Sequence, residues 1–153
     1  MQLIDRVPNC NGCSACVVGC KYGLVKMVDR EEGYKGEKQV PLIGENSCSK
    51  CNACTLFCPI YNPVEIPAFD EWYEYDEKYS VRNRDVVKAY REAMHSVREG
   101  KHTEFTGTLC EIAGIKSLLG DKIPQNLIIK PMVCSIEKRE SEECCKDCIF
   151  YDK

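Results

Sequence analysis

The chain has 153 residues, and its 21 basic and 24 acidic side chains give a formal net charge of −3. This length allows one ordinary domain or two small ones. The acidic balance, with no run of lysine or arginine, argues against nucleic acid as a partner. No apolar run approaches the roughly 18 residues of a membrane span, so the sequence also argues against an integral membrane protein.

Thirteen cysteines would suit a disulfide scaffold in a secreted protein, but the sequence argues against that class. The N-terminal MQLIDRVPNC lacks the basic and apolar regions of a signal peptide. The number of cysteines is odd, and most lie two or three residues apart. Reduced thiols at this density are expected in a reducing compartment, where they hold metal. We therefore expect a cytoplasmic protein.

Two cysteine runs share one spacing. Residues 10–20 read CNGCSACVVGC and residues 48–59 read CSKCNACTLFCP, so both contain C-x2-C-x2-C-x3-C, the run of bacterial two-cluster ferredoxins. A single C-x2-C is more often a zinc site, and zinc stays the alternative. Two complete runs favour two 4Fe-4S clusters. The residues between the cysteines are small, which lets backbone N–H groups approach the cluster sulfides: Gly12, Ser14, Ala15, Ser49, Asn52 and Ala53.

The spacing also predicts how the ligands are shared. Three cysteines of a run can wrap one cubane, while the fourth lies a turn further on and points to the neighbouring core. This predicts one cluster held by Cys10, Cys13, Cys16 and Cys58, and another held by Cys48, Cys51, Cys54 and Cys20. Pro59 is expected to turn the chain away after Cys58, whereas Lys21 follows Cys20.

The stretch between the runs has two apolar segments, Leu24–Val28 and Val40–Ile43, on either side of a charged turn. We expect an internal repeat of loop, short helix and strand, used twice, that depends on the clusters for folding. Residues 5–62 resemble dicluster ferredoxin domains, and we assign residues 1–62 to such a domain.

The next segments connect this domain to a second region, expected over residues 80–153. Pro63 and Pro67 mark a linker over residues 63–79, in which FDEWYEYDEKY is expected to pack its rings on the ferredoxin lobe as a strand or edge segment. Stacking of Trp72 on a cofactor is the alternative. Asn83–Gly100 has the period of an amphipathic helix. His95 and His102 are interpreted as ordinary surface or packing residues.

The region after this helix predicts a βαβ unit. A short strand ends at Phe105, a turn follows over Thr106, Gly107 and Thr108, a helix covers Cys110–Leu119, and a buried strand covers Leu127–Ile129. Backbone N–H groups of the turn can hold an anion such as a flavin phosphate. The predicted fold class is α+β, a dicluster ferredoxin-like domain followed by a small α/β fragment.

The stretches WYEYDEKYSVRN and FTGTLCEIAGIKSLLG, with Cys134 and the terminal CCKDCIFYDK, resemble the coenzyme F-420 hydrogenase/dehydrogenase beta-subunit family. The family includes bacterial members with an N-terminal dicluster ferredoxin, so the resemblance covers nearly the whole chain. The resemblance implies a flavin domain, FAD, and a third 4Fe-4S cluster. Its implied ligands are Cys110, Cys134, Cys145 and Cys148, with Cys144 left over; the alternative is reduced thiols or a partial zinc site. Members have more chain between the equivalents of Arg82 and Val87, and they continue past Tyr151, so we expect a truncated relative.

The predicted function is electron transfer by an iron–sulfur protein, either a carrier or an accessory oxidoreductase subunit rather than a stand-alone enzyme. Bound clusters would make the protein more acidic, which suits docking to a basic patch on a redox partner protein. One alternative is a flavin-dependent oxidoreductase of the F-420 type with a third cluster. Another is an interaction module that metal stabilises without any redox role.

Overall fold

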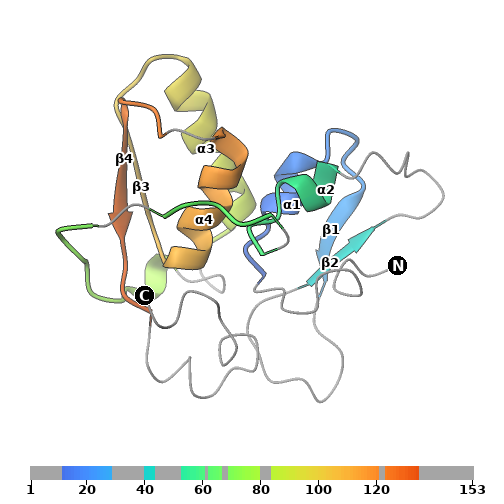
Figure 1. The fold of residues 1–153 in the computed structure, drawn as a ribbon, viewed down its shortest axis with the longest axis horizontal. Helices are drawn as coiled ribbons and strands as arrows, with labels where there is room; N and C mark the ends of the chain where they lie inside the picture. The colour runs from blue at the N-terminus through green and yellow to red at the C-terminus, as the bar shows by residue number, and fades with distance from the viewer. Residues whose placement is uncertain are drawn as a thin grey trace.

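The computed structural model describes residues 12–28, 40–43, 53–60, 62–66, 69–79, 84–120 and 123–134. Within these ranges helices and strands are mixed (Figure 1). In chain order they are α1 (Ala15–Gly19), β1 (Val25–Val28), β2 (Val40–Ile43), α2 (Ala53–Leu56), the 3-10 helix η3 (Glu77–Tyr79), α3 (Val86–Arg98), β3 (Thr103–Gly107), α4 (Leu109–Leu119) and β4 (Leu127–Pro131). None of these helices is long and apolar enough to cross a membrane.

The N-terminal half contains α1, β1, β2 and α2. The two predicted apolar segments form the strands, which pair antiparallel with Val25 opposite Ile43 and Val28 opposite Val40. The expected repeat of loop, helix and strand is therefore only partly right. A strand follows α1, but residues 57–60 and 62–66 contain no strand after α2. The second apolar segment, Val40–Ile43, precedes the second cysteine run in the chain. It therefore pairs with β1 and does not form a strand after α2.

The second half contains the predicted strand, helix and strand, but the second strand is only partly buried, contrary to the prediction, and Ile128 is 40% exposed. β3 and β4 pair in parallel, with Thr103 opposite Leu127 and Gly107 opposite Pro131, and α4 connects them. The predicted strand end at Phe105 is wrong. Thr106 and Gly107 continue β3 because β4 also continues past Ile129 and supplies partners for them.

Helix α3 is shorter than the predicted Asn83–Gly100. It begins at Val86 because the carboxylate of Asp85 accepts a hydrogen bond from the backbone N–H of Lys88 at 3.1 Å, which caps the first turn. It ends at Arg98, and Gly100 follows with a φ of 77°, a left-handed conformation that favours glycine.

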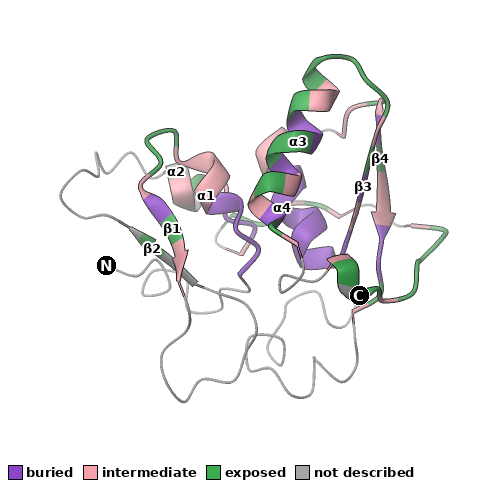
Figure 2. Cartoon of the chain, turned by 180° about the vertical axis from the view of Figure 1, so that it is seen from behind, coloured by how far each residue is buried: buried purple, intermediate pink, exposed green. Residues whose placement is uncertain are grey.

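The helices of the two halves meet in the middle of the molecule. Helix α1 packs against both α3 and α4, while β1–β2 and β3–β4 lie on the outer sides (Figure 1). Figure 2 shows buried stretches, in purple, in α1, α3 and α4. The second half has a core that includes Tyr90, Phe105 and Ile115. The cysteine loop before α1 therefore lies against a packed support.

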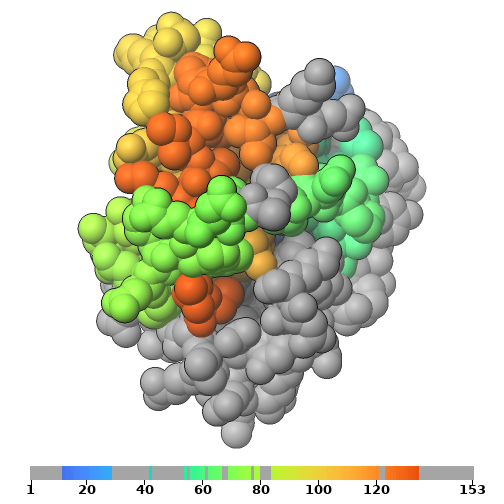
Figure 3. Space-filling view, turned by 60° about the vertical axis from the view of Figure 1, so that its left-hand side comes forward, coloured from blue at the N-terminus to red at the C-terminus, as the bar shows by residue number. Residues whose placement is uncertain are grey.

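The aromatic part of the linker packs differently from the prediction. Tyr73 forms a bridge to Met132, with backbone hydrogen bonds of 2.9 Å from Tyr73 to Pro131 and from Val133 to Tyr73. Phe69 packs against the start of α4. Figure 3 shows residues 62–66 and 69–79, in green, lying across the second half. Tyr73 thus forms an edge pairing beyond the end of β4, as the edge-segment prediction expects. The ring of Phe69 packs on α4 and the rings of Trp72 and Tyr73 are exposed, so the expected packing of the rings on the ferredoxin lobe is wrong.

Candidate metal centre

The loop before α1 has two residues in the left-handed region of backbone conformation. Gly12 has a φ of 72° and Ser14 a φ of 68°, and the Ser14 hydroxyl donates to the carbonyl of Gly12 at 3.3 Å. For serine this conformation is uncommon and costs roughly 1–3 kcal/mol, so it persists only where the surroundings enforce it. Left-handed residues aim backbone N–H groups into concavities that hold phosphate or iron–sulfur cores. The loop thus contains backbone conformations of the kind found in such concavities.

Helix α1 separates the cysteines of the first run. Cys13 lies in the loop and Cys16 in the first turn of α1, and both are buried. Cys20 is the half-buried residue that ends the helix, and its N–H donates to the carbonyl of Cys16 at 3.1 Å. The fourth cysteine is thus one turn beyond the third, as the spacing predicts. Cys10 lies outside the described residues.

The second run is described only at its end. Cys54 lies in α2, and the buried Cys58 is followed by Pro59, whose side chain is almost entirely inaccessible. The N–H of Asn62 donates to the carbonyl of Cys58 at 2.7 Å, and its side-chain amide donates to the carbonyl of Leu56 at 3.1 Å. The chain therefore turns after Cys58. Cys48 and Cys51 lie outside the described residues.

The two runs come together around β1. Cys16 and Val25 form a buried cluster, and Cys20 and Cys54 pack against it. Cys20 and Cys54 were predicted to bind the same 4Fe-4S cluster, whereas Cys16 was predicted to bind the other 4Fe-4S cluster. Among the described residues, no three cysteine, histidine or acidic side chains are placed to hold a single metal ion. A 4Fe-4S cluster does not require three side chains around one ion, because each of its four cysteine thiolates binds a different iron. Thiolates are also the soft ligands that iron–sulfur clusters prefer.

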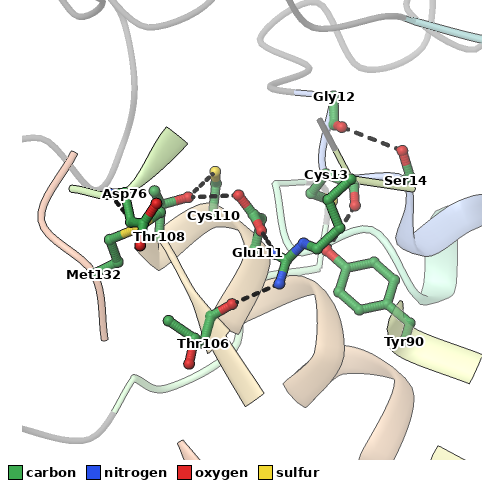
Figure 4. A network of polar contacts seen from close by, with 11 residues as sticks. Gly12, Cys13, Ser14, Asp76, Tyr90, Thr106, Thr108, Cys110, Glu111 and Met132 are labelled. Carbon is green, nitrogen blue, oxygen red and sulfur yellow. Dashed lines mark hydrogen bonds and ion pairs between the residues drawn. The ribbon is translucent and has the colours of Figure 1, made fainter. Parts of the chain in front are cut away.

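One hydrogen bond joins the cysteine loop to the second half. The hydroxyl of Tyr90, on α3, donates to the carbonyl of Cys13 at 2.7 Å (Figure 4). Tyr90 is fully buried. Burial raises the pKa of Tyr90 well above its usual value, and the nearby Cys13, Glu111 and Cys110 act in the same direction, so the hydroxyl keeps the proton that it donates. The predicted amphipathic helix over Asn83–Gly100 includes Tyr90, but its spacing did not single out this residue.

The predicted anion-binding turn is built differently. Thr106 and Gly107 belong to β3, and their carbonyls accept hydrogen bonds from the Arg84 guanidinium at 2.9 Å and from the Met132 N–H at 2.8 Å. Only Thr108 lies between strand and helix, where it precedes α4. Its hydroxyl lies 3.0 Å from the Cys110 sulfur. The structure therefore brings the three residues to the start of α4, but the first two are strand residues.

A carboxylate lies beside Thr108 in the first turn of α4. Glu111 is buried, accepts a hydrogen bond from the Thr108 hydroxyl at 3.2 Å, and forms an ion pair with Arg84 (Figure 4). A negative charge is favourable at a helix N-terminus. The carboxylate of Glu111 provides this charge, as a bound anion would otherwise do. Sequence analysis missed it. The Thr-x-x-Glu spacing of a capping box would have indicated Glu111.

The cysteines assigned to a third cluster are described only in part. Cys110 is buried at the start of α4, where Leu109, Cys110 and Ala113 pack against Val64 and Phe69. Cys134 is half-buried and follows β4. Cys145 and Cys148, together with Cys144, lie outside the described residues. The third cluster therefore stays a prediction.

Comparison with known proteins supports the reading of the N-terminal half. Residues 9–62 match the 4Fe-4S dicluster domain family, and this stretch includes all eight cysteines of the two runs. No curated protein gives a significant match, and neither does any solved structure. The N-terminal part is thus a ferredoxin-type domain, which supports an iron–sulfur electron-transfer role for the chain.

Proposed function

We propose that this protein transfers electrons through two 4Fe-4S clusters bound by residues 1–62, as an accessory subunit of a flavin-linked oxidoreductase. The match of residues 9–62 to the 4Fe-4S dicluster domain family is the observation on which the proposal rests. The left-handed backbone at Gly12 and Ser14 supports it independently, because such loops aim N–H groups at anionic cores.

The proposed ligands are shared crosswise between the runs. One cluster takes Cys10, Cys13, Cys16 and Cys58, and the other takes Cys48, Cys51, Cys54 and Cys20. The position of Cys20, one turn beyond Cys16 in the chain, supports this division. The buried Cys58, with Pro59 behind it, supplies the fourth thiolate from the second run.

The thiolates act as ligands and not as nucleophiles. When bound, 4Fe-4S clusters accept and release single electrons. The chain contributes a loop held in a fixed backbone conformation and sulfur ligands shielded from water, since Cys13, Cys16 and Cys58 are buried. Burial and hydrogen bonds near the sulfurs set the reduction potential of such centres.

The proposed partner is a redox protein or a larger oxidoreductase subunit with a basic docking surface. The chain has a formal charge of −3, and bound clusters with their thiolates add further negative charge. Opposite charge on the partner would speed the encounter. The many thiolate ligands also require a reducing compartment, so we place the protein in the cytoplasm.

A second candidate is a flavin-dependent oxidoreductase of the F-420 hydrogenase beta-subunit type. The parallel pairing of β3 and β4 around α4, with Cys110 at the start of that helix, supports it. A flavin phosphate at this helix start would have to be accommodated beside the buried carboxylate of Glu111. We therefore rank this candidate second. Flavin analysis of protein purified gently without oxygen tests it, and protein that neither contains nor takes up flavin would exclude it.

Reversible reduction tests the primary proposal. Protein purified without oxygen should lose visible absorbance on addition of dithionite, give the EPR signals of reduced 4Fe-4S clusters, and recover its absorbance when an electron acceptor is added. A protein that holds metal but cannot be reduced and reoxidised would instead be a metal-stabilised interaction module, and the electron-transfer proposal would be wrong.

A further inference from the structure

We infer that Tyr90 is a positioning residue for the cluster that Cys13 binds, and that the second half of the chain thereby steadies one cluster more than the other. The inference rests on the proposed function. It starts from the 2.7 Å hydrogen bond between the Tyr90 hydroxyl and the carbonyl of Cys13, whose partners are 77 residues apart in the sequence. The bond is buried, and Figure 4 shows the Tyr90 hydroxyl directed at the loop of Gly12, Cys13 and Ser14.

The ring of Tyr90 is held on two sides. It stacks on Phe105 of β3 with ring centroids 5.7 Å apart. On α4, a Cβ added to Gly114 would lie 2.7 Å from the Tyr90 hydroxyl and 3.6 Å from the Cβ of Ala15 in α1. Glycine costs stability in the middle of a helix, and here its missing side chain makes the space that the hydroxyl occupies. The position of the hydroxyl is therefore fixed by α3, β3 and α4 together.

This hydroxyl meets the loop where its backbone is most constrained. Cys13 lies between two left-handed residues, Gly12 and Ser14. An uncommon backbone conformation persists only if neighbouring structure enforces it, and Tyr90 supplies a buried donor at the residue between them. Cys20 and Cys54, which belong to the other proposed cluster, pack around Val25 within the N-terminal half. Among the described residues, the hydrogen bond from Tyr90 of α3 reaches the loop that carries Cys13, so we expect its support to fall on the cluster that Cys13 binds.

Iron release tests the inference with Tyr90→Phe, which keeps the ring and removes only the hydroxyl. Loaded protein is mixed without oxygen with an iron chelator, and release is followed over time. About half of the iron should leave roughly tenfold faster than in the unaltered protein, and the rest at the unaltered rate, because removing one buried hydrogen bond weakens only the Cys13 loop. Tyr73→Phe is the matched control, since Tyr73 is exposed, and it should leave both phases unchanged.

The assignment of the faster phase requires a second variant. In Tyr90→Phe combined with Cys58→Ala, the faster phase should be absent, because Cys58 is proposed to bind the same cluster as Cys13. Equal acceleration of both phases would show a general loosening of the fold, and an unchanged release curve would show no positioning role. Either result overturns the inference.

Gly114→Ala keeps the inference testable if Tyr90→Phe fails to fold. An added methyl group would displace the Tyr90 hydroxyl while leaving every hydrogen-bonding group in place, so the same phase should accelerate. If the unaltered protein binds no iron and sulfide, the proposed function fails. If the unaltered protein binds two clusters, and both Tyr90→Phe and Gly114→Ala release iron at the unaltered rate, only the inference about Tyr90 fails.

Discussion

Gly19, the last residue of α1, lies directly against Phe57, the residue that follows α2. A Cβ on Gly19 would lie 3.0 Å from the Cβ and Cγ of Phe57 and closer still to its ring. The absence of a side chain at Gly19 is therefore what lets the two cysteine-bearing helices pack together.

Gly19→Ala should weaken this packing. We expect the variant to lose about 1–3 kcal/mol of stability, because an extra methyl group must displace the Phe57 ring. Urea unfolding of the loaded protein without oxygen measures the loss. Phe57→Leu in the same chain should restore part of it, since leucine is smaller than phenylalanine. An unchanged urea midpoint for Gly19→Ala would contradict the packing described here.

Cysteine variants should fall into two matching pairs. Cys13→Ala and Cys58→Ala should lose the same cluster, and Cys20→Ala and Cys54→Ala should lose the other, because each fourth cysteine is proposed to cross to the neighbouring core. EPR spectra of the reduced proteins show which cluster remains. If Cys58→Ala instead gives the same spectrum as Cys54→Ala, each run binds its own cluster and the crosswise assignment is wrong.

Glu111→Gln should destabilise the second half. The change leaves the Arg84 guanidinium without its charged partner in a site where its side chain is 17% exposed and that of Glu111 only 4%. Breaking a buried pair from one side costs roughly 3–5 kcal/mol. The matched control is Glu104→Gln, since Glu104 pairs with Lys130 at 3.0 Å on the surface and such pairs contribute about 0–1 kcal/mol. Equal urea midpoints for the two variants would contradict this account.

The start of α3 should depend on the Asp85 carboxylate. Asp85→Ala removes the acceptor for the Lys88 N–H and should cost about 1 kcal/mol. Asp85→Asn keeps a side-chain oxygen at that position and should cost less. Thermal unfolding followed by circular dichroism compares the two. If both variants melt at the same temperature as the unaltered protein, the cap contributes nothing measurable.

Local structure could be predicted largely from the sequence. The apolar segments indicated β1, β2 and the strand–helix–strand order of the second half, because these elements depend on residues close together in the chain. The expected strand after α2 was not found among residues 57–60 and 62–66. Boundaries were less accurate where a partner decides them. Strand β3 reaches Gly107 only because β4 supplies Pro131 opposite it.

The contacts between residues far apart in the sequence could not be predicted. Tyr90 has the same spacing as the apolar residues of α3, and nothing near it in the sequence distinguishes a residue that binds a carbonyl 77 positions away. Arg84 and Glu111 are 27 residues apart, and their pairing depends on how α4 packs. The same holds for Gly114, whose sequence neighbours do not show that a tyrosine hydroxyl lies above it. Such contacts arise from tertiary packing alone.

Iron and acid-labile sulfide, measured per chain on protein purified without oxygen, test the central claim most directly. Two crosswise-bound cubanes predict about eight irons and as many sulfides, and about twelve of each would add the third cluster of the second candidate. Stoichiometric zinc without any labile sulfide would contradict the account.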